Sequence, residues 1–287
     1  MDAPTKDLRR ILAPNPSPLT GPGTNTFLLG RDSVAVIDPG PDDPAHREAI
    51  LRAGGGRISH ILVTHAHLDH SAGAGPLARL TGAPVLAFGE ATAGRSPLMR
   101  RLAAQGATGG GEGLDHGFAP DAVLRDGDTV AGADWSLSVL HTPGHAGGHL
   151  AFRWGDRVLC GDVVMGWSST ILSPPDGDLA DYLRTLDRLA ETGARQLLPA
   201  HGAPIDDPAA RLAELAAHRR ERTAQILAAL AQGPADAATL AGRLYDIAPH
   251  LMPAAARNVL AHLLALTDLG VVAPVGDLHP GAEFARS

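Results

Sequence analysis

Short apolar runs, each closed by a turn rich in glycine, proline or aspartate, fill the first 200 residues of the chain. Runs rich in Val, Ile and Leu are typical of strands, and they are predicted at 24–29, 34–37, 57–64, 84–88, 136–141, 150–154, 158–160 and 196–198. Longer amphipathic stretches predict helices at 44–53, at 76–80 and after Asp178. Because strands and helices alternate, we expect an α/β fold.

This pattern fails between residues 91 and 121, where glycines are frequent and no period is sustained. Such a segment is more often a surface loop or a lid than a domain of its own. Both roles stay open for it at this point. His116 lies within the segment, and for this side chain a solvated loop position is preferred over a place in a pocket.

A mostly helical pattern follows residue 205. Helices are predicted at 209–231, 237–244 and 253–269, and two short apolar stretches, 271–275 and Leu278, then flank a Gly276-Asp277 turn. Three helices and a β-hairpin make a winged helix. The sequence therefore predicts a larger domain over 1–205, followed by a linker helix and a winged helix over 206–287.

The composition is that of an ordinary globular protein, with 44% apolar residues, 19% charged residues and a net charge of −7. Nucleic-acid binding depends on Lys and Arg, so this acidic balance weighs against such a partner. Residues 206–287 contain seven Arg, no Lys and nine acidic residues, which makes DNA an unfavourable partner for the winged helix. The first residues lack the apolar core of a secretory signal, and no apolar run is long enough for a membrane span. We expect a cytoplasmic protein that does not contact membranes.

The sequence Thr-His-Ala-His-Leu-Asp-His at 64–70 gathers three imidazoles and a carboxylate at the end of a predicted strand. Side chains alternate faces in an extended segment, so His65 and His67 can reach one metal ion together. Asp69 and His70 come after the chain has turned into a loop or helix, and both can then serve a second ion nearby. The spacing therefore predicts two metal ions.

Further polar residues stand where an apolar run gives way to a turn: Asp38, His145, Asp162 and His201. Binding residues are commonly held on loops at one edge of a rigid sheet. We therefore expect these side chains to converge with the 64–70 cluster in space.

With His-x-His-x-Asp-His at 65–70, followed by His145, Asp162 and His201, the chain resembles the metallo-beta-lactamase superfamily over about residues 1–205. The resemblance implies a four-layer αββα sandwich with a two-metal site at one edge of its two sheets. It also implies ligands for one metal at His65, His67 and His145, ligands for the other at Asp69, His70 and His201, and Asp162 as the bridge. Two zinc ions per chain are expected, and these ligand types leave iron or manganese open.

Some of the other residues near these motifs have two possible roles. Asp38 either orients metal ligands or caps the turn before Pro39. His149 either contacts the substrate or packs behind the site. Trp167 and Thr170 follow Asp162 with Ser168 and Ser169, and they are expected at the floor of the pocket. Cys160 is expected to be a small buried residue of the core. His141 is expected either in the core or behind the metal ligands.

The predicted activity is that of a zinc-dependent hydrolase in which a metal-bridged hydroxide attacks an electrophilic carbonyl or phosphorus. Because the net acidity of the chain disfavours polyanions, we expect a small acyl substrate such as a lactam, a lactone or a thioester. Asp69 would additionally orient or shuttle the proton. A lactamase-like body with a winged helix is similar to the beta-lactamase-like protein 2 group, where the tail shapes the substrate entrance or an interface. That similarity keeps single-stranded RNA cleavage as an alternative and leaves a homodimer open. A metal-containing ligand sensor with a DNA-binding winged helix and a redox enzyme with iron are the remaining hypotheses.

Overall fold

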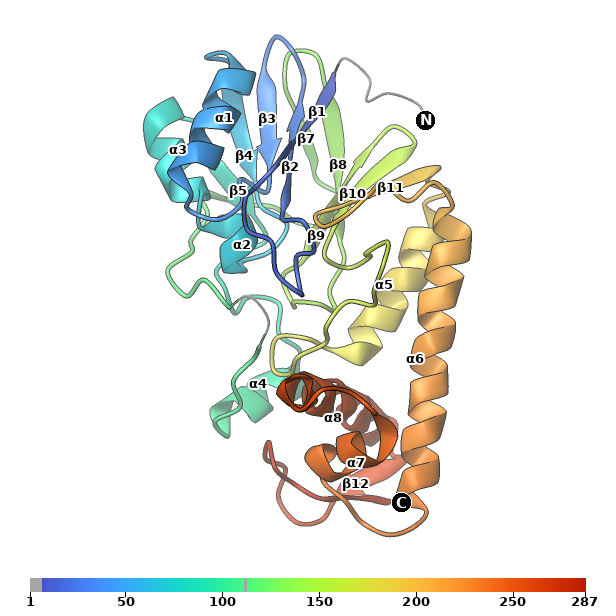
Figure 1. Ribbon diagram of the computed structural model, residues 1–287. Helices are drawn as coiled ribbons and strands as arrows, with labels where there is room; N and C mark the ends of the chain where they lie inside the picture. The colour runs from blue at the N-terminus through green and yellow to red at the C-terminus, as the bar shows by residue number, and fades with distance from the viewer. Residues whose placement is uncertain (1–6, 111–112) are drawn as a thin grey trace.

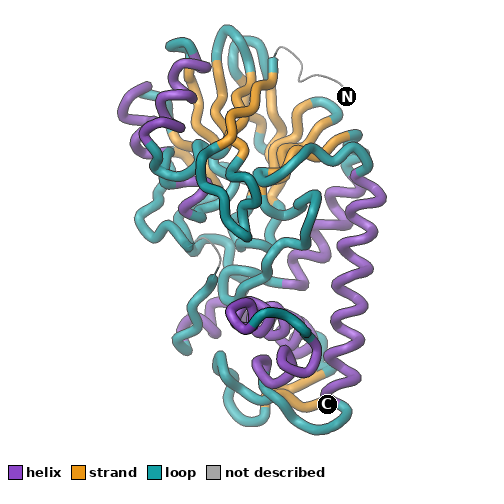
Figure 2. Tube along the Cα trace, viewed as in Figure 1, coloured by secondary structure: helices purple, strands orange, loops and turns teal. Residues whose placement is uncertain are grey.

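Two β-sheets lie face to face with helices on both outer sides in the computed structural model, which describes residues 7–110 and 113–287 (Figure 1). Colouring by secondary structure shows the strands in the middle of the larger part, with helices on either side (Figure 2). The expected α/β class and the four-layer αββα arrangement are confirmed.

The first sheet has six strands in chain order: β1 (Leu8–Leu12), β2 (Asn25–Leu29), β3 (Val34–Ile37), β4 (Ile58–Leu62), β5 (Val85–Ala87) and β6 (Ala122–Val123). β1 to β3 pair antiparallel, and β3 to β6 pair parallel, so β3 and β4 end at the same edge. Helices α1 (Pro44–Gly54) and α3 (Ala74–Thr81) cover the outer face. α1 begins at Asp43, whose side chain accepts a hydrogen bond from the His46 N–H, and ends before Gly55 in the left-handed conformation.

The second sheet has five strands in the order β11 (Gln196–Pro199), β10 (Arg157–Gly161), β9 (Leu150–Trp154), β8 (Ser136–His141) and β7 (Thr129–Ala131). Only the pair formed by β10 and β11 is parallel. Helix α5 (Leu179–Glu191) packs on its outer face through Tyr182 and Leu186, which join Val158 and Leu197 in one core. The core between the two sheets is apolar and includes Phe27, Leu137 and Phe152.

The C-terminal part consists of the long helix α6 (Pro208–Leu230), then α7 (Ala237–Leu244), a 3₁₀ turn (Pro249–Leu251), α8 (Met252–Asp268) and the strands β12 (Val272–Pro274) and β13 (Phe284–Arg286). These elements share an apolar core with α4 (Pro97–Ala104), and Figure 1 shows α4 beside α8. Helix α8 also reaches the larger part, since Ala261 belongs to the same core as Tyr182. The predicted winged helix is confirmed.

Several elements differ from the sequence prediction. Strands β1, β6 and β7 and helix α4 lie where no element is predicted, and a short helix α2 (Leu68–Ser71) follows β4. The expected tight hairpin at Gly276-Asp277 is wrong: β12 pairs with β13, and residues 275–283 form the loop between them. The reason is Phe284, which is fully buried in the C-terminal core and fixes the second strand there.

The segment at 91–121 is neither a domain nor wholly irregular. α4 begins at Ser96, whose side chain accepts a hydrogen bond from the Met99 N–H, and its buried face consists of Met99 and Leu102. Residues 111 and 112 lie outside the described part of the chain. No helix among the described residues is long and apolar enough to cross a membrane.

Candidate metal centre

The polar residues expected at turns come together at one edge of the two sheets. β3 leads into Asp38, β4 into the 64–70 segment, β10 into Asp162 and β11 into His201, while His145 lies in the loop between β8 and β9. Helix α2 starts at Leu68, directly after His67, so Asp69 and His70 are presented from its first turn. These side chains are buried.

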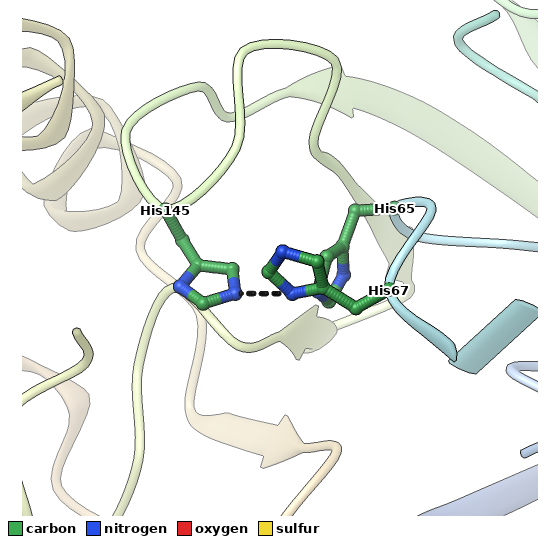
Figure 3. Close-up of side chains that lie close together, drawn as sticks. All are labelled: His65, His67 and His145. Carbon is green, nitrogen blue, oxygen red and sulfur yellow. Dashed lines mark hydrogen bonds between the residues drawn. The ribbon is translucent and has the colours of Figure 1, made fainter. Parts of the chain in front are cut away.

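Three imidazoles form the first group (Figure 3). Nδ1 of His67 lies 2.9 Å from Nε2 of His65 and 3.1 Å from Nε2 of His145. Ligand nitrogens placed tetrahedrally at 2.0–2.1 Å from zinc are about 3.3 Å apart. Both measured spacings therefore suit nitrogens that share one metal ion, and all three donor atoms lie within 4.8 Å of one another.

Carboxylates and imidazoles alternate in the second group. Nε2 of His201 lies 3.2 Å from Oδ2 of Asp69 and 3.3 Å from Oδ1 of Asp162. Nε2 of His70 lies 3.4 and 3.5 Å from the same two oxygens. Asp162 reaches the first group through Oδ2, which is 3.7 Å from Nε2 of His145. Its carboxylate thus stands between the two groups.

Within the described residues, three buried atoms of this cluster have no hydrogen-bond partner of normal geometry: Oδ1 of Asp69, Nε2 of His70 and Oδ1 of Asp162. A buried polar atom without a partner is destabilising by about 1–3 kcal/mol, so such atoms need another explanation. A cation held by nitrogen and oxygen donors would satisfy all three. The residues present therefore fit a pair of divalent ions.

The ring nitrogens that point away from the cluster are arranged as in a metal site. Nδ1 of His145 lies 3.0 Å from the Ile171 carbonyl, and Nδ1 of His201 lies 3.2 Å from the Gly23 carbonyl. A carbonyl only accepts, so Nδ1 holds a proton, and Nε2 is the ring nitrogen that faces the cluster, where a metal ion can bind it by displacing any proton there. Ligand histidines in metal sites are oriented in this way.

The histidines of the cluster differ in their pKa values when no metal ion is bound. Burial and the nearby rings of His70 and His67 hold the pKa of His65 well below its usual value, and burial with His145 lowers the pKa of His67 to about 3. Burial also opposes a charge on His201, but the Asp162 carboxylate raises the pKa of His201 to about 10. Metal ions that bind such a site displace protons from it.

Asp38 is held in the left-handed region, with a φ of 51°, and is nearly fully buried. Its Oδ1 accepts a hydrogen bond of 2.8 Å from the Thr64 N–H, and its Oδ2 accepts one of 2.8 Å from the Thr64 hydroxyl. The same Oδ2 lies 3.0 Å from Nδ1 of His70. Of the two readings of Asp38, these contacts favour the one in which it orients ligands, because it holds His70 directly and His65 through Thr64.

The other expected residues lie in different places. Thr170 contacts His145, with its Oγ1 2.9 Å from Nδ1. His149 packs behind the site, since its Nε2 accepts a hydrogen bond from the Asp162 N–H and its Nδ1 contacts Thr142. Cys160 is buried in β10, and burial raises the pKa of its thiol, as expected of a core residue.

Trp167 does not form the floor of the pocket. Its side chain is 46% exposed and packs over Gly21 and Gly202, and a Cβ on Gly202 would lie 2.6 Å from the ring. Ser168 and Ser169 beside it lack full burial as well. His116 is exposed, as expected of a solvated loop residue. His141, the last residue of β8, is partly buried and stacks on Phe88.

A cavity of about 40 Å³ opens onto the two groups. Leu19, Met165 and Ile171 provide its apolar wall, and Ser173 and Asp176 provide further polar atoms. Oγ of Ser173 is buried and has no hydrogen-bond partner among the described residues, whereas Asp176 accepts hydrogen bonds from Arg95. The sequence pattern did not indicate Ser173 or Asp176, because neither follows a predicted strand.

Comparison with known proteins agrees with this fold and site. The model of the metallo-beta-lactamase superfamily matches residues 19–201, and the model of the beta-lactamase associated winged helix domain matches residues 237–282. A beta-lactamase-like protein 2 homolog from Drosophila melanogaster is 30% identical over 93% of this chain and 89% of its own length. The crystal structure of a metallo-beta-lactamase family protein from Thermus thermophilus has a TM-score of 0.78 and 31% identity over 98% of this chain and 99% of that one.

A third relative has a named activity. The atrochrysone carboxyl ACP thioesterase of Aspergillus fumigatus is 26% identical over 77% of this chain, which spans 64% of the fungal protein. The superfamily model covers well over half of the present chain, including every side chain of the two groups described above. The chain therefore belongs to the metallo-beta-lactamase superfamily.

Proposed function

We propose that this protein is a dinuclear zinc hydrolase that acts on small acyl substrates, such as lactams, lactones or thioesters. The observation that carries the proposal is the convergence of two donor groups whose buried atoms lack partners within the described chain. In the proposal, His65, His67 and His145 hold one ion, and Asp69, His70 and His201 hold the other. Asp162 serves both, since its carboxylate stands between the groups.

When bound, the two ions supply an acidified water molecule and a Lewis acid for the electrophilic carbonyl. The protein's own groups do the rest. Asp69 faces the cavity, and the His70 charge and its hydrogen bonds outweigh burial, so that its pKa lies below the usual value. The oxygen of Asp69 that is not bound to an ion can accept a proton and return it to the leaving group.

The lining of the cavity favours an uncharged acyl group over a phosphodiester. No Arg or Lys is found among the described residues that line it, whereas Asp69, Asp162 and Asp176 all face it. The bound ions would offset the charges of Asp69 and Asp162, and Asp176 is paired with Arg95, so RNA is disfavoured because the described lining lacks a cationic side chain to hold the neighbouring phosphates of an RNA chain. The thioesterase activity named for the fungal relative agrees with an acyl substrate, and that activity is carried over here as part of the proposal.

The burial of α8 argues against the sensor hypothesis. A winged helix that reads DNA places its third helix in a groove, but Val259, Ala261 and Leu263 of α8 are fully buried among neighbouring elements. Together with the acidic charge of residues 206–287, this leaves α8 without a basic face for DNA, since Arg257 is its only Arg or Lys.

A hydrolysis panel tests the proposal. The purified protein is assayed with a chromogenic cephalosporin, an acyl thioester, a lactone and a labelled single-stranded RNA, and its metals are measured by mass spectrometry. We expect two zinc ions per chain and acyl hydrolysis that Asp69→Asn removes without loss of the fold. Cleavage of RNA without acyl hydrolysis would show that the substrate is a phosphodiester instead of an acyl compound. Iron in place of zinc would show that the assigned metal is wrong. Retained hydrolysis in the Asp69→Asn variant would exclude the role given to Asp69.

A further inference from the structure

The loop at 168–173 is held from the side of the winged helix by a buried arginine. Arg219 lies in the middle of α6 and is only 2% exposed. Its Nη2 donates a hydrogen bond to the Thr170 carbonyl, its Nη1 donates one of 3.2 Å to Oδ1 of Asn258 on α8, and its guanidinium stands 5.3 Å from the Tyr182 ring centre. No ion pair joins Arg219 to a carboxylate in the described part of the chain.

Such an arrangement is unfavourable for stability alone. Burying a charged guanidinium without an opposite charge is expensive, and an apolar side chain of similar length would fill the same space. Burial accordingly lowers the pKa of Arg219. The two hydrogen bonds and the contact with the Tyr182 ring offset part of this penalty. Each of them joins Arg219 to one specific residue.

Asn258 completes the arrangement. Its Oδ1 accepts a second hydrogen bond of 3.3 Å from the Leu172 N–H, so a single amide oxygen joins α6, α8 and the loop. The loop residues between these two attachment points carry the groups that face His145. Oγ1 of Thr170 and the Ile171 carbonyl lie 2.9 and 3.0 Å from Nδ1 of that ring.

We propose that Arg219 and Asn258 act as positioning residues that fix the 168–173 loop and thereby the orientation and tautomer of the His145 ring. The winged helix thus contributes to the metal centre without touching it. This inference rests on the proposed function, because it takes His145 to be a metal ligand. It assigns to the C-terminal part a role in preparing the site.

The test uses the full-length protein and zinc ion alone as the probe. Arg219→Met and Asn258→Leu remove the hydrogen bonds at nearly constant size, and Asn258→Asp keeps an acceptor oxygen at the same place. Arg222→Met is the matched control, since Arg222 is also on α6, stacks on Tyr245 and donates to the Leu244 carbonyl, but does not contact the loop. Zinc affinity is measured by competition with a chelator, and amide hydrogen exchange at 170–172 is measured in the metal-free protein.

We expect Arg219→Met and Asn258→Leu to weaken zinc binding about tenfold and to speed exchange at the Leu172 amide, as found when groups that orient metal ligands are removed. Asn258→Asp should restore both properties, and Arg222→Met should change neither. Zinc affinity within twofold of wild type in folded Arg219→Met and Asn258→Leu would overturn the inference, as would an equal loss in Arg222→Met. If Arg219→Met does not fold, the Asn258 pair decides the question on its own.

Failure of the proposed function looks different. A wild-type protein that does not bind zinc would remove the hydrolase proposal, while the exchange data in metal-free protein would still show whether Arg219 and Asn258 hold the loop. Unchanged exchange in both variants, with zinc bound normally by the wild type, would count against the positioning role alone.

Discussion

Replacing Asp38 by Asn tests how far the metal centre depends on a residue that is not itself one of the proposed ligands. The side chains are nearly isosteric, and Asn tolerates the left-handed backbone conformation that Asp38 adopts at φ 51°. Oδ1 of the new amide still accepts from the Thr64 N–H, so only the group at Oδ2 changes. An NH₂ group there meets the Thr64 hydroxyl and Nδ1 of His70.

The expected effect follows from the tautomer of His70. An amide NH₂ donates, so Nδ1 of His70 would have to accept, and the ring proton would move to Nε2. Nε2 is the atom that faces Asp69 and Asp162. Loss of a ligand-orienting partner typically weakens metal binding 10–100-fold, which corresponds to about 1.4–2.8 kcal/mol of binding free energy. Loss of hydrogen bonds to the carboxylate should reduce the free energy of unfolding of the metal-free protein by about 1–3 kcal/mol.

Chelator competition measures the zinc affinity, and urea denaturation of the metal-free protein measures the stability. Asp207→Asn serves as the control, since this residue caps α6 away from the site and Asn caps a helix as well as Asp does. A folded Asp38→Asn variant that binds both zinc ions as tightly as wild type would refute the reasoning. So would a loss of the same size in Asp207→Asn.

Two further predictions concern the C-terminal part. Burial lowers the pKa of His262 to about 3, with Arg219, Arg222 and His218 adding to the effect, while its Nδ1 contacts Thr223. The stability that depends on neutral His262 is therefore present above pH 6.5 and is lost as the pH falls toward 3. Between pH 7 and pH 5, the free energy of unfolding of the wild type, measured by urea denaturation, should fall by about 2 kcal/mol more than that of His262→Gln. Equal losses in the two proteins would contradict this. A chain truncated after residue 205 should be unfolded or aggregated, because α6 and α8 contribute to the core around Tyr182. Circular dichroism and light scattering measure this, and a folded, monomeric fragment that binds zinc would contradict the prediction.

The sequence predicts the residues of the candidate site better than their surroundings. Parallel pairing of β3 with β4 and of β10 with β11 brings Asp38 and His65, and Asp162 and His201, to one edge of each sheet, so these meetings follow from local pattern. His145 lies in the loop between the antiparallel strands β8 and β9, and it joins the others through the packing of the two sheets. The contacts of Asp38 with Thr64 and His70 depend on a backbone conformation that the pattern does not encode.

What the sequence does not reveal depends on contacts between distant segments. β1 reads Leu-Arg-Arg-Ile-Leu, which has no alternation, and it becomes a strand because it can pair with the buried β2 at the sheet edge. α4 lies among glycines, and its two buried residues pack with α6 and the winged helix, more than 100 residues later. Arg219 stands in a His-Arg-Arg-Glu-Arg run that reads as a solvated helix face, and only the fold distinguishes it from Arg220.

These long-range contacts also bear on what the winged helix does in this protein. If it were an independent module attached to a lactamase-like body, the surface between the two would be mostly polar and exposed residues would dominate it. Instead Ala261 lies fully buried in the same core as Tyr182, and the buried Arg219, together with Asn258, holds the loop that carries Thr170. Removing or moving the winged helix would therefore disturb the side of the metal centre on which His145 stands. Because α8 is buried and bonded to this loop, it is not available to enter a DNA groove, so we infer that the C-terminal part supports the candidate metal centre.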